Sequence, residues 1–485
     1  MRTSFFLKGN SFVLTLLYLC ITIYNVIFLD SPVGLVLSLA QYALVVYFFL
    51  KNDVHTAFFL HVIFTVSCVN GGLIIIDHSF SYAKVKLFGP FTLNYIMLGI
   101  MWIRTLKYST RVDKKSLLLS FKKMVRIFIV VGSLVGLIGF AIDGGYKVKY
   151  LIDSLLYVVV AYLYVDIFIK LYNDTYSKQF AISTVCMLAA SSISAVLTFY
   201  LFGVSAEYSV DESFISNPIY YMTPCLVIGF FQMRDFRLKT IAALALIFYV
   251  ASAIIMSRGA TYLTMFVALV LLIYLVYFKE SKKGSSLRYL KPILPILLVV
   301  GIPLILNAIL SSGEISGNKL NQFLSLFSLL DFDESLQNRL ALVGRSPYIR
   351  IAQIIEIFNE GLDNIIMLII GKGYGSYYTD SMGLFSGIDL SLGVFPDDMI
   401  NSGKFYKAHN VISCTLLYNG LVGLFYMFKL GFSYLRRIDK TFLVFAGFSL
   451  FLYGFYFDTV ALVSCSMALF GAEYIICQNK TEEVL

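Results

Sequence analysis

Long apolar runs separated by short polar segments dominate the chain. Runs such as 266–273 and 297–300 are apolar at every position, so they lack the alternation that marks the strand of a membrane barrel. A helix satisfies its own backbone groups in hydrocarbon, and about 20 apolar residues are enough to cross a bilayer. The pattern therefore predicts an all-α membrane protein.

About 14 transmembrane helices fit the pattern. The first run, 11–29, has no small-residue cleavage site and is followed at once by another span, so we expect it to be a helix and not a signal peptide. The predicted spans are 11–29, 33–50, 54–76, 89–106, 125–142, 151–172, 180–203, 219–233, 240–256, 260–278, 292–310, 408–430, 441–457 and 459–477.

Composition supports lipid as the solvent. The chain is 59% hydrophobic and 14% charged, with a mean hydropathy of +0.81, whereas a typical soluble domain is about a quarter charged. We expect the seven cysteines to be buried small apolar residues, because their spacing matches no metal motif. The sequence therefore gives no reason to expect a metal, a cofactor or disulfide stapling.

The distribution of Lys and Arg sets the orientation. With the N-terminus inside, 26 of the 38 basic residues fall on the cytoplasmic side, whereas 19 of the 29 acidic residues fall outside. Positive residues favour the cytoplasmic side, so both termini are predicted to be cytoplasmic. The net charge of +9 then belongs to the face that meets anionic headgroups and is no evidence for nucleic acid.

One connecting segment is far longer than the others. The chain divides into helices 1–11 over residues 1–310, an extracytoplasmic loop over 311–407, and helices 12–14 with a short tail over 408–485. The loop holds 11 acidic and 7 basic residues. Two apolar stripes at helical spacing predict short amphipathic helices at the interface or packed on the bundle: Leu320, Phe323, Leu324 and Phe327, then Ile351, Ile354, Ile355 and Phe358.

Arginines at the predicted outer face are the first candidates for chemistry. Arg258 lies in a tight turn between two long apolar runs, and Arg339, Arg345 and Arg350 crowd into a short stretch of the acidic loop. A guanidinium binds phosphate in a bidentate fork. The alternatives are an arginine that snorkels from a helix end and solvated loop charges.

His409 is the candidate for acid–base chemistry. It opens the span that follows the large loop, where it has both water and an apolar flank, and histidine can serve as a general base near neutral pH. The alternative is an interfacial histidine bonded to a backbone carbonyl. His55, His61 and His78 have no metal-ligand spacing and are expected to be structural.

Further polar residues fall within or near the spans. Asp166, Asn70, Asn307 and Glu473 either line a cavity or bond one helix to another. The glycine-rich segment 371–375 resembles a phosphate loop only loosely, and predicts a turn that allows close backbone approach.

The order of these motifs resembles a known family. SRGA stands at 257–260, an arginine precedes the stripe at 351, GKGYG follows at 371–375, AHN at 408–410 and GLVG at 420–423. This order is similar to that of the O-antigen polymerase (Wzy) and O-antigen ligase superfamily over about residues 250–425. The family often has a tryptophan after the loop arginine, where this sequence has isoleucines.

The resemblance implies a metal-independent glycosyltransferase of the bacterial inner membrane. Its donor would be a glycan on undecaprenyl diphosphate, with Arg258, Arg350 and Arg345 as diphosphate ligands and His409 as the base. Length and span number favour a polymerase that acts on another lipid-linked repeat, in an inverting reaction, with a chain-length regulator and a flippase as partners. The alternatives are a ligase that uses lipid A core as acceptor and, in a different class, a lipid-linked oligosaccharide flippase.

Overall fold

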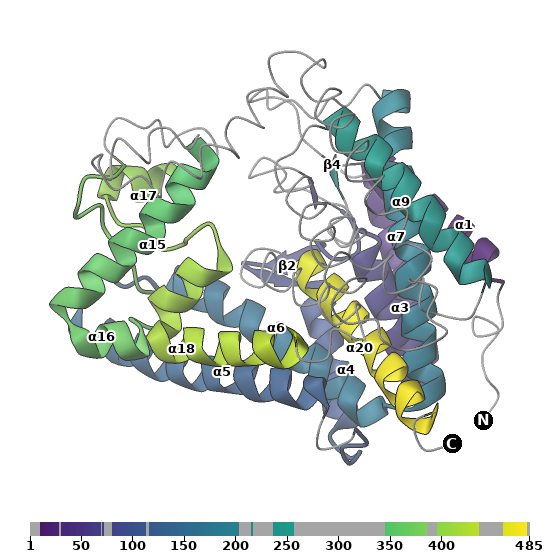
Figure 1. Ribbon diagram of the computed structural model, residues 1–485, viewed down its shortest axis with the longest axis horizontal. Coiled ribbons are helices and arrows are strands. Elements are labelled where there is room, and N and C mark those ends of the chain that lie inside the picture. Colours follow the sequence, from purple (N-terminus) through teal and green to yellow (C-terminus); the bar gives the residue numbers. More distant parts are fainter. Residues whose placement is uncertain are drawn as a thin grey trace, which may run out of the picture.

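A computed structural model describes residues 10–28, 31–68, 70–71, 80–112, 116–202, 215–216, 236–256, 345–385, 395–435 and 459–482. These residues are mostly helical (Figure 1). Five of their helices are long and apolar enough to cross a membrane, and three shorter apolar helices accompany them. The described part is therefore that of a helical membrane protein. The predicted spans 219–233, 260–278, 292–310 and 441–457 lie outside it.

Eight helices are described between residues 10 and 256. They are α1 (Ser11–Ile27), α2 (Pro32–Leu50), α3 (Val54–Val66), α4 (Leu93–Thr105), α5 (Leu117–Ile142), α6 (Val148–Leu171), α7 (Asp174–Phe202) and α9 (Phe236–Met256).

The second half contributes α15 (Arg345–Asp363), α16 (Ile365–Ile370), α17 (Asp397–Ser402), α18 (Val411–Leu435) and α20 (Thr459–Glu482). Short strands pair as antiparallel couples, β1 (Asn70–Gly71) with β4 (Ile215–Ser216) and β2 (Lys86–Phe88) with β3 (Phe91–Thr92).

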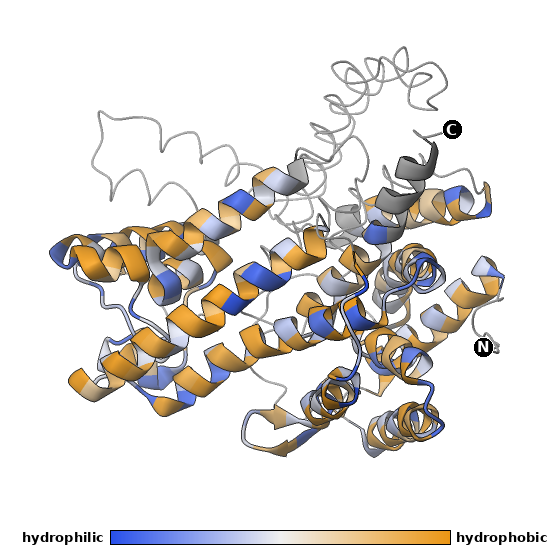
Figure 2. Ribbon diagram, turned by 90° about the horizontal axis from the view of Figure 1, so that it is seen from below, coloured by the Kyte–Doolittle hydropathy of each residue, from blue (hydrophilic) through white to orange (hydrophobic). Residues whose placement is uncertain are grey.

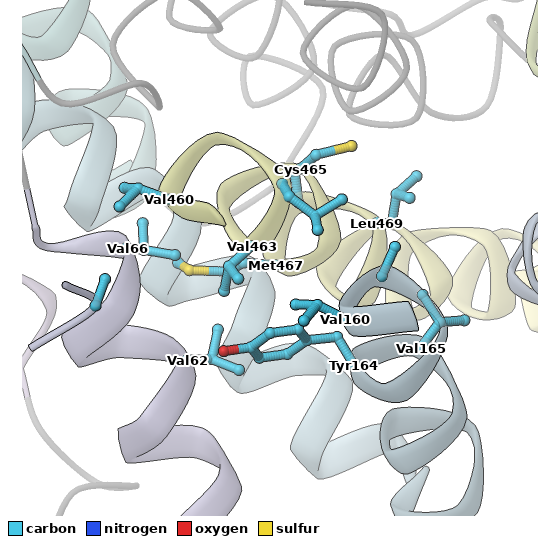
Figure 3. Packing of buried hydrophobic residues seen from close by; sticks show 14 of the residues in the cluster. Val62, Val66, Val160, Tyr164, Val165, Val460, Val463, Cys465, Met467 and Leu469 are labelled. Atoms are coloured by element: carbon cyan, nitrogen blue, oxygen red, sulfur yellow. The ribbon is translucent and has the colours of Figure 1, made fainter. Parts of the chain in front are cut away.

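One group of helices packs around α7, which contacts α1, α9 and α20. Aliphatic side chains from α3, α6 and α20 meet in its interior around Tyr164 (Figure 3). The rings of Phe168 and Phe470 stack there at a centroid distance of 4.0 Å. Close packing of this kind joins the last described helix to the first half of the chain.

A second group carries residues 345–385 and 395–407, the described part of the predicted outer segment. α5 pairs with both α6 and α18, and α15 and α16 lie against α18 (Figure 1). Beyond Arg126 the outward face of α5 is apolar (Figure 2), with Leu134, Leu137 and Ile138 each more than half exposed. Such a face suits hydrocarbon and not water.

Helix ends depart from the predicted spans where side chains cap the backbone. α3 ends at Val66, ten residues before the predicted end, and the Ser67 hydroxyl then bonds back to the Phe64 carbonyl. α5 begins earlier than predicted because the Ser116 side chain caps it. The span predicted to begin at 89 starts at Leu93, after a turn between β2 and β3.

α18 is broken in its middle. Gly420 has φ 60° and ψ −159° inside the helix, a backbone conformation that favours glycine. The predicted continuous span 408–430 is thus two helical pieces, which turn sharply at this residue (Figure 1). The apolar composition continues across the break, so hydropathy does not reveal it.

Hydrogen bonds link several of the described connecting segments into two groups. The turn between α5 and α6 bonds to the outer segment, where the Tyr377 hydroxyl donates to Asp143 at 3.0 Å and Tyr406 donates to the Gly145 carbonyl at 2.7 Å. At the opposite ends, Arg104 donates to Asn52, and Ser116 donates to Glu473. The segments assigned to opposite sides of the membrane therefore stay apart in these contacts.

Candidate functional site

The structure places two of the predicted site residues where α15 meets the start of α18, a junction that we call the corner. Arg350 lies in the first half of α15 and is exposed, and His409 stands directly before α18 and is half-buried. The Asn410 side-chain amide donates to the Arg350 carbonyl at 3.4 Å. Arg345 is the first residue of α15. Arg258 and Arg339 lie outside the described residues.

Asn410 explains why His409 sits where it does. Its side-chain oxygen accepts from the Ser413 backbone amide at 2.7 Å, and its carbonyl accepts from the Cys414 amide at 3.0 Å. This is the geometry of a helix N-cap. The adjacent histidine consequently precedes the first turn of α18 and projects from a fixed position at the mouth of the helix.

Gln353 connects the two helices and was missed by sequence reasoning. Its side chain is fully buried. Its oxygen accepts from the His409 backbone amide at 2.7 Å, and its nitrogen lies 2.8 Å from Nδ1 of the same residue. The Phe395 ring meets the imidazole edge-on at 4.9 Å. The ring of His409 is therefore fixed in position and orientation.

The polar face of α15 points inward. Gln353, Glu356 and Glu360 follow the i, i+3, i+7 spacing of one helical face, and the first two are 0% exposed. Phe358, in the apolar stripe, is instead 42% exposed. Ile351 and Ile355 of the same stripe are partly buried against the core, so the stripe turns outward at its Phe358 end. The spacing of these polar positions, at intervals of three and then four residues, was the signal available in the sequence.

This polar face holds the segment that follows α16. Glu356 accepts from the Ser381 hydroxyl at 2.8 Å and from the Met382 amide at 3.1 Å. Glu360 accepts from Lys372 at 2.5 Å and from the Thr379 amide at 2.7 Å. Because several hydrogen bonds converge on each carboxylate, the segment 372–382 is held against α15.

The glycine-rich segment 371–375 is a close-approach turn, as predicted. Gly371, Gly373 and Gly375 have φ of 83°, 79° and 83°. A Cβ on Gly373 would lie 2.0 Å from the backbone nitrogen of Gly136 on α5. The segment therefore wedges between α5 and α18 with no space for side chains at the glycines.

The same segment is not a phosphate cradle. The amide of Lys372 donates to the Leu417 carbonyl at 2.7 Å, that of Gly373 to Tyr418 at 3.2 Å, and that of Tyr374 to Gly132 at 2.9 Å. A phosphate loop needs such amides directed at its ligand. Here they satisfy irregular backbone that lies between helices.

Lysines and acidic residues alternate near the turn between α5 and α6 and the residues just before His409. Lys147 lies 3.7 Å from Asp398, and Lys407 lies 3.6 Å from Asp153. Lys404 stands over the Tyr377 ring at 4.4 Å. These partly exposed pairs give the rim a mixed charge, so they do not by themselves form an anion site.

The other polar residues singled out in the sequence have structural partners. Asp166 lies 2.5 Å from Lys122 and 2.8 Å from Lys170, which favours helix–helix bonding over a cavity role. The His61 ring nitrogens lie 2.7 Å from the Tyr82 hydroxyl and 2.9 Å from the Tyr164 hydroxyl. His78 and Asn307 lie outside the described residues.

Within the described ranges, no group of three or more His, Cys, Asp or Glu side chains is arranged to hold a metal ion. No known family profile matches the chain, and no curated protein matches it.

Proposed function

We propose that the chain is a polysaccharide polymerase of the bacterial cytoplasmic membrane. It transfers a glycan from undecaprenyl diphosphate to a hydroxyl of another lipid-linked repeat, with about 14 spans and its site on the outer face. The proposal covers O-antigen and capsule polymers alike, and the lipid-linked glycans are its substrates.

The junction of α15 with the start of α18, which holds Arg350 and His409, carries this proposal. The exposed guanidinium belongs to α15, the imidazole precedes α18, and Gln353 and Asn410 link the two elements. The chain just before His409 lies at the end of the α5–α6 pair, where Tyr406 donates to the Gly145 carbonyl, and exposed apolar residues of α5 lie near this end. A lipid-linked donor has its diphosphate at such a boundary between lipid and water, so the corner suits it.

The reaction needs little else from the protein. Diphosphate departs as an anion, and a fixed guanidinium stabilises the charge that develops on it. Attack by the acceptor hydroxyl on the anomeric carbon in one displacement inverts the configuration. Arg258 and Arg345 are the further diphosphate ligands of this proposal, which involves no metal.

Replacing Arg350 tests the proposal. We expect Arg350→Ala to lower polymer formation by roughly a hundredfold to a thousandfold, as for loss of one charge-stabilising donor, and to leave single repeat units on the carrier. Arg350→Lys should recover only part of the activity because lysine lacks the bidentate fork. The measurement is the length distribution of surface polysaccharide in cells that carry each variant.

Arg126→Ala is the matched control, since Arg126 is an exposed arginine near the opposite end of α5. It should leave polymer length unchanged. Wild-type polymer in the Arg350→Ala strain, at equal protein level, would refute the proposal. Complete loss of exported repeats would favour a flippase, and polymer that forms but fails to join lipid A core would favour a ligase.

A further inference from the structure

The Gln353 side chain leaves His409 a single tautomer. The backbone amide of His409 is a donor, so the Gln353 atom that faces it at 2.7 Å is the acceptor Oε1. The Gln353 nitrogen, a donor, therefore faces Nδ1 at 2.8 Å. Nδ1 must accept this bond, and in the neutral ring the proton then lies on Nε2.

The other tautomer fits neither orientation of the amide. With a proton on Nδ1 and the amide as it stands, two N–H groups would face each other. Turning the amide by 180° would satisfy Nδ1–H but would set the NH2 group against the His409 backbone amide. Since Gln353 is fully buried, water does not relieve either conflict, and a buried donor without an acceptor is costly.

We propose that Gln353 is a positioning residue that holds His409 as the Nε2–H tautomer, so that the imidazole meets the substrate as a hydrogen-bond donor and not as a base. This inference rests on the proposed glycosyl transfer for its functional meaning. It replaces the role of general base that the sequence suggested for His409, because a base needs a lone pair on the nitrogen that faces the substrate.

The transfer still balances with a donor in this place. The acceptor oxygen forms its bond to the anomeric carbon, and the bond from that carbon to the diphosphate oxygen breaks with its electron pair on the diphosphate. His409 Nε2–H donates to the diphosphate as this charge develops, beside Arg350. The hydroxyl proton passes to solvent water at the outer boundary, because in-line attack sets the acceptor hydroxyl on the face of the sugar opposite the departing diphosphate.

The tautomer can be observed directly. Nitrogen NMR of the full-length protein with 15N-histidine distinguishes protonated from unprotonated ring nitrogens, and the chain has 4 histidines. The His409 signals are those lost in His409→Gln. We expect an unprotonated, hydrogen-bonded Nδ1 and a protonated Nε2. A protonated Nδ1 in the neutral ring would overturn the inference, yet would leave glycosyl transfer itself untouched.

Gln353→Glu reverses the arrangement with little change in shape. One carboxylate oxygen accepts from the His409 backbone amide and the other accepts from Nδ1–H, so the single proton moves to Nδ1. At a pH where the spectrum shows this form, we expect glycan transfer to fall at least tenfold. Unchanged or faster transfer in that form would show that His409 acts as a base and would overturn the inference.

His61 provides the internal control. It is fully buried in the other helical group between Tyr82 and Tyr164, so its signals report on the fold and not on Gln353. They should be the same in wild type and Gln353→Glu. If they move, Gln353→Met is used in place of Gln353→Glu, because methionine removes both bonds without adding charge. An unchanged ratio of His409 tautomers in Gln353→Met would refute the role of Gln353.

Discussion

Glu356 brings a carboxyl group into the interior of the outer segment. It is 0% exposed, and burial is the main reason that its pKa is raised above the ordinary range for glutamate, with the neighbouring Asp380 adding to the effect. The bonds from Ser381 and Met382 oppose this shift without cancelling it. Folding therefore shifts the ionisation equilibrium of this carboxyl group toward its protonated form.

The raised pKa predicts how stability depends on pH. A group whose pKa is higher in the folded state contributes stability below its unfolded pKa, and this contribution is lost as pH rises through the folded pKa. Glu356→Gln removes the titration and keeps the shape. We expect the variant to gain thermal stability relative to wild type as pH rises from about 4 to about 8, a range that begins at ordinary glutamate values.

Glu360→Gln is the control for this measurement. Glu360 lies one turn along the same face and pairs with Lys372 at 2.5 Å, so its neutralisation leaves a partly buried lysine without its partner. Thermal unfolding in detergent should show Glu360→Gln less stable than wild type at neutral pH. If Glu356→Gln loses stability in the same way, the carboxylate is ionised in the fold.

Residue type and place along the chain could identify part of the corner. Arg350 and His409 stood out because charged groups beside long apolar runs are uncommon. Gln353 and Glu356 did not, because polar residues opposite an apolar stripe ordinarily face water. In this fold they face inward, and only the contacts between α15 and the residues from 376 to 382 reveal it. Local spacing does not reveal which residue from a distant part of the chain a side chain will contact.

At the scale of elements, the wedge formed by residues 371–375 determines how α5 and α18 pack. We expect Gly373→Ala to lower stability by roughly 3 kcal/mol or more, since it adds backbone strain at positive φ to a clash with the α5 backbone. The added Cβ would meet Gly136 backbone atoms that belong to a continuous helix and cannot move alone. The shift in the thermal unfolding midpoint measures this loss.

A substitution at Gly403 separates the effect of backbone strain from that of the clash. It has a similar positive φ of 63°, but a Cβ there would meet nothing within 4 Å. Gly403→Ala should therefore show only the conformational cost of about 1 kcal/mol. Equal losses in the two variants would mean that close approach of the wedge to α5 contributes nothing.

Sequence patterns predicted the existence of the helices better than their form. The spans near α1, α2 and α6 could be placed to within a few residues because each is a single apolar run between polar turns. The early end of α3 and the break in α18 could not, since their apolar composition continues past these points. At Gly420, the cause is the approach of Ile369 and Gly371 from another part of the chain.

At the scale of the whole molecule, the two groups of connecting segments predict which positions share a side of the membrane. Lys149 near the start of α6 and Lys123 near the start of α5 are both exposed, at opposite ends of the pair. In a background without the native cysteines, we expect Lys149→Cys in intact cells to react with a membrane-impermeant maleimide. Lys123→Cys should react only after permeabilisation, in line with the distribution of positive charge.

Both cysteines should react equally in detergent, which checks that each is accessible in the folded protein. Labelling of Lys123→Cys alone in intact cells would reverse the predicted orientation, and with it the outer location of the corner.

The hydropathy pattern predicted the membrane class at this scale, because composition alone determines which solvent surrounds the helices. The count of 14 spans stays a prediction, since several spans lie outside the described residues.

The wedge also constrains the order of events during synthesis. α5 enters the membrane long before residues 371–375 leave the ribosome, and α18 follows them. Until all three are present, the groove around Gly132 and Gly136 lacks the backbone that fills it. The partner of α15 at the corner also arrives only with the start of α18. A nascent chain therefore cannot assemble Arg350 and His409 early, and the paired corner appears only in a nearly complete protein.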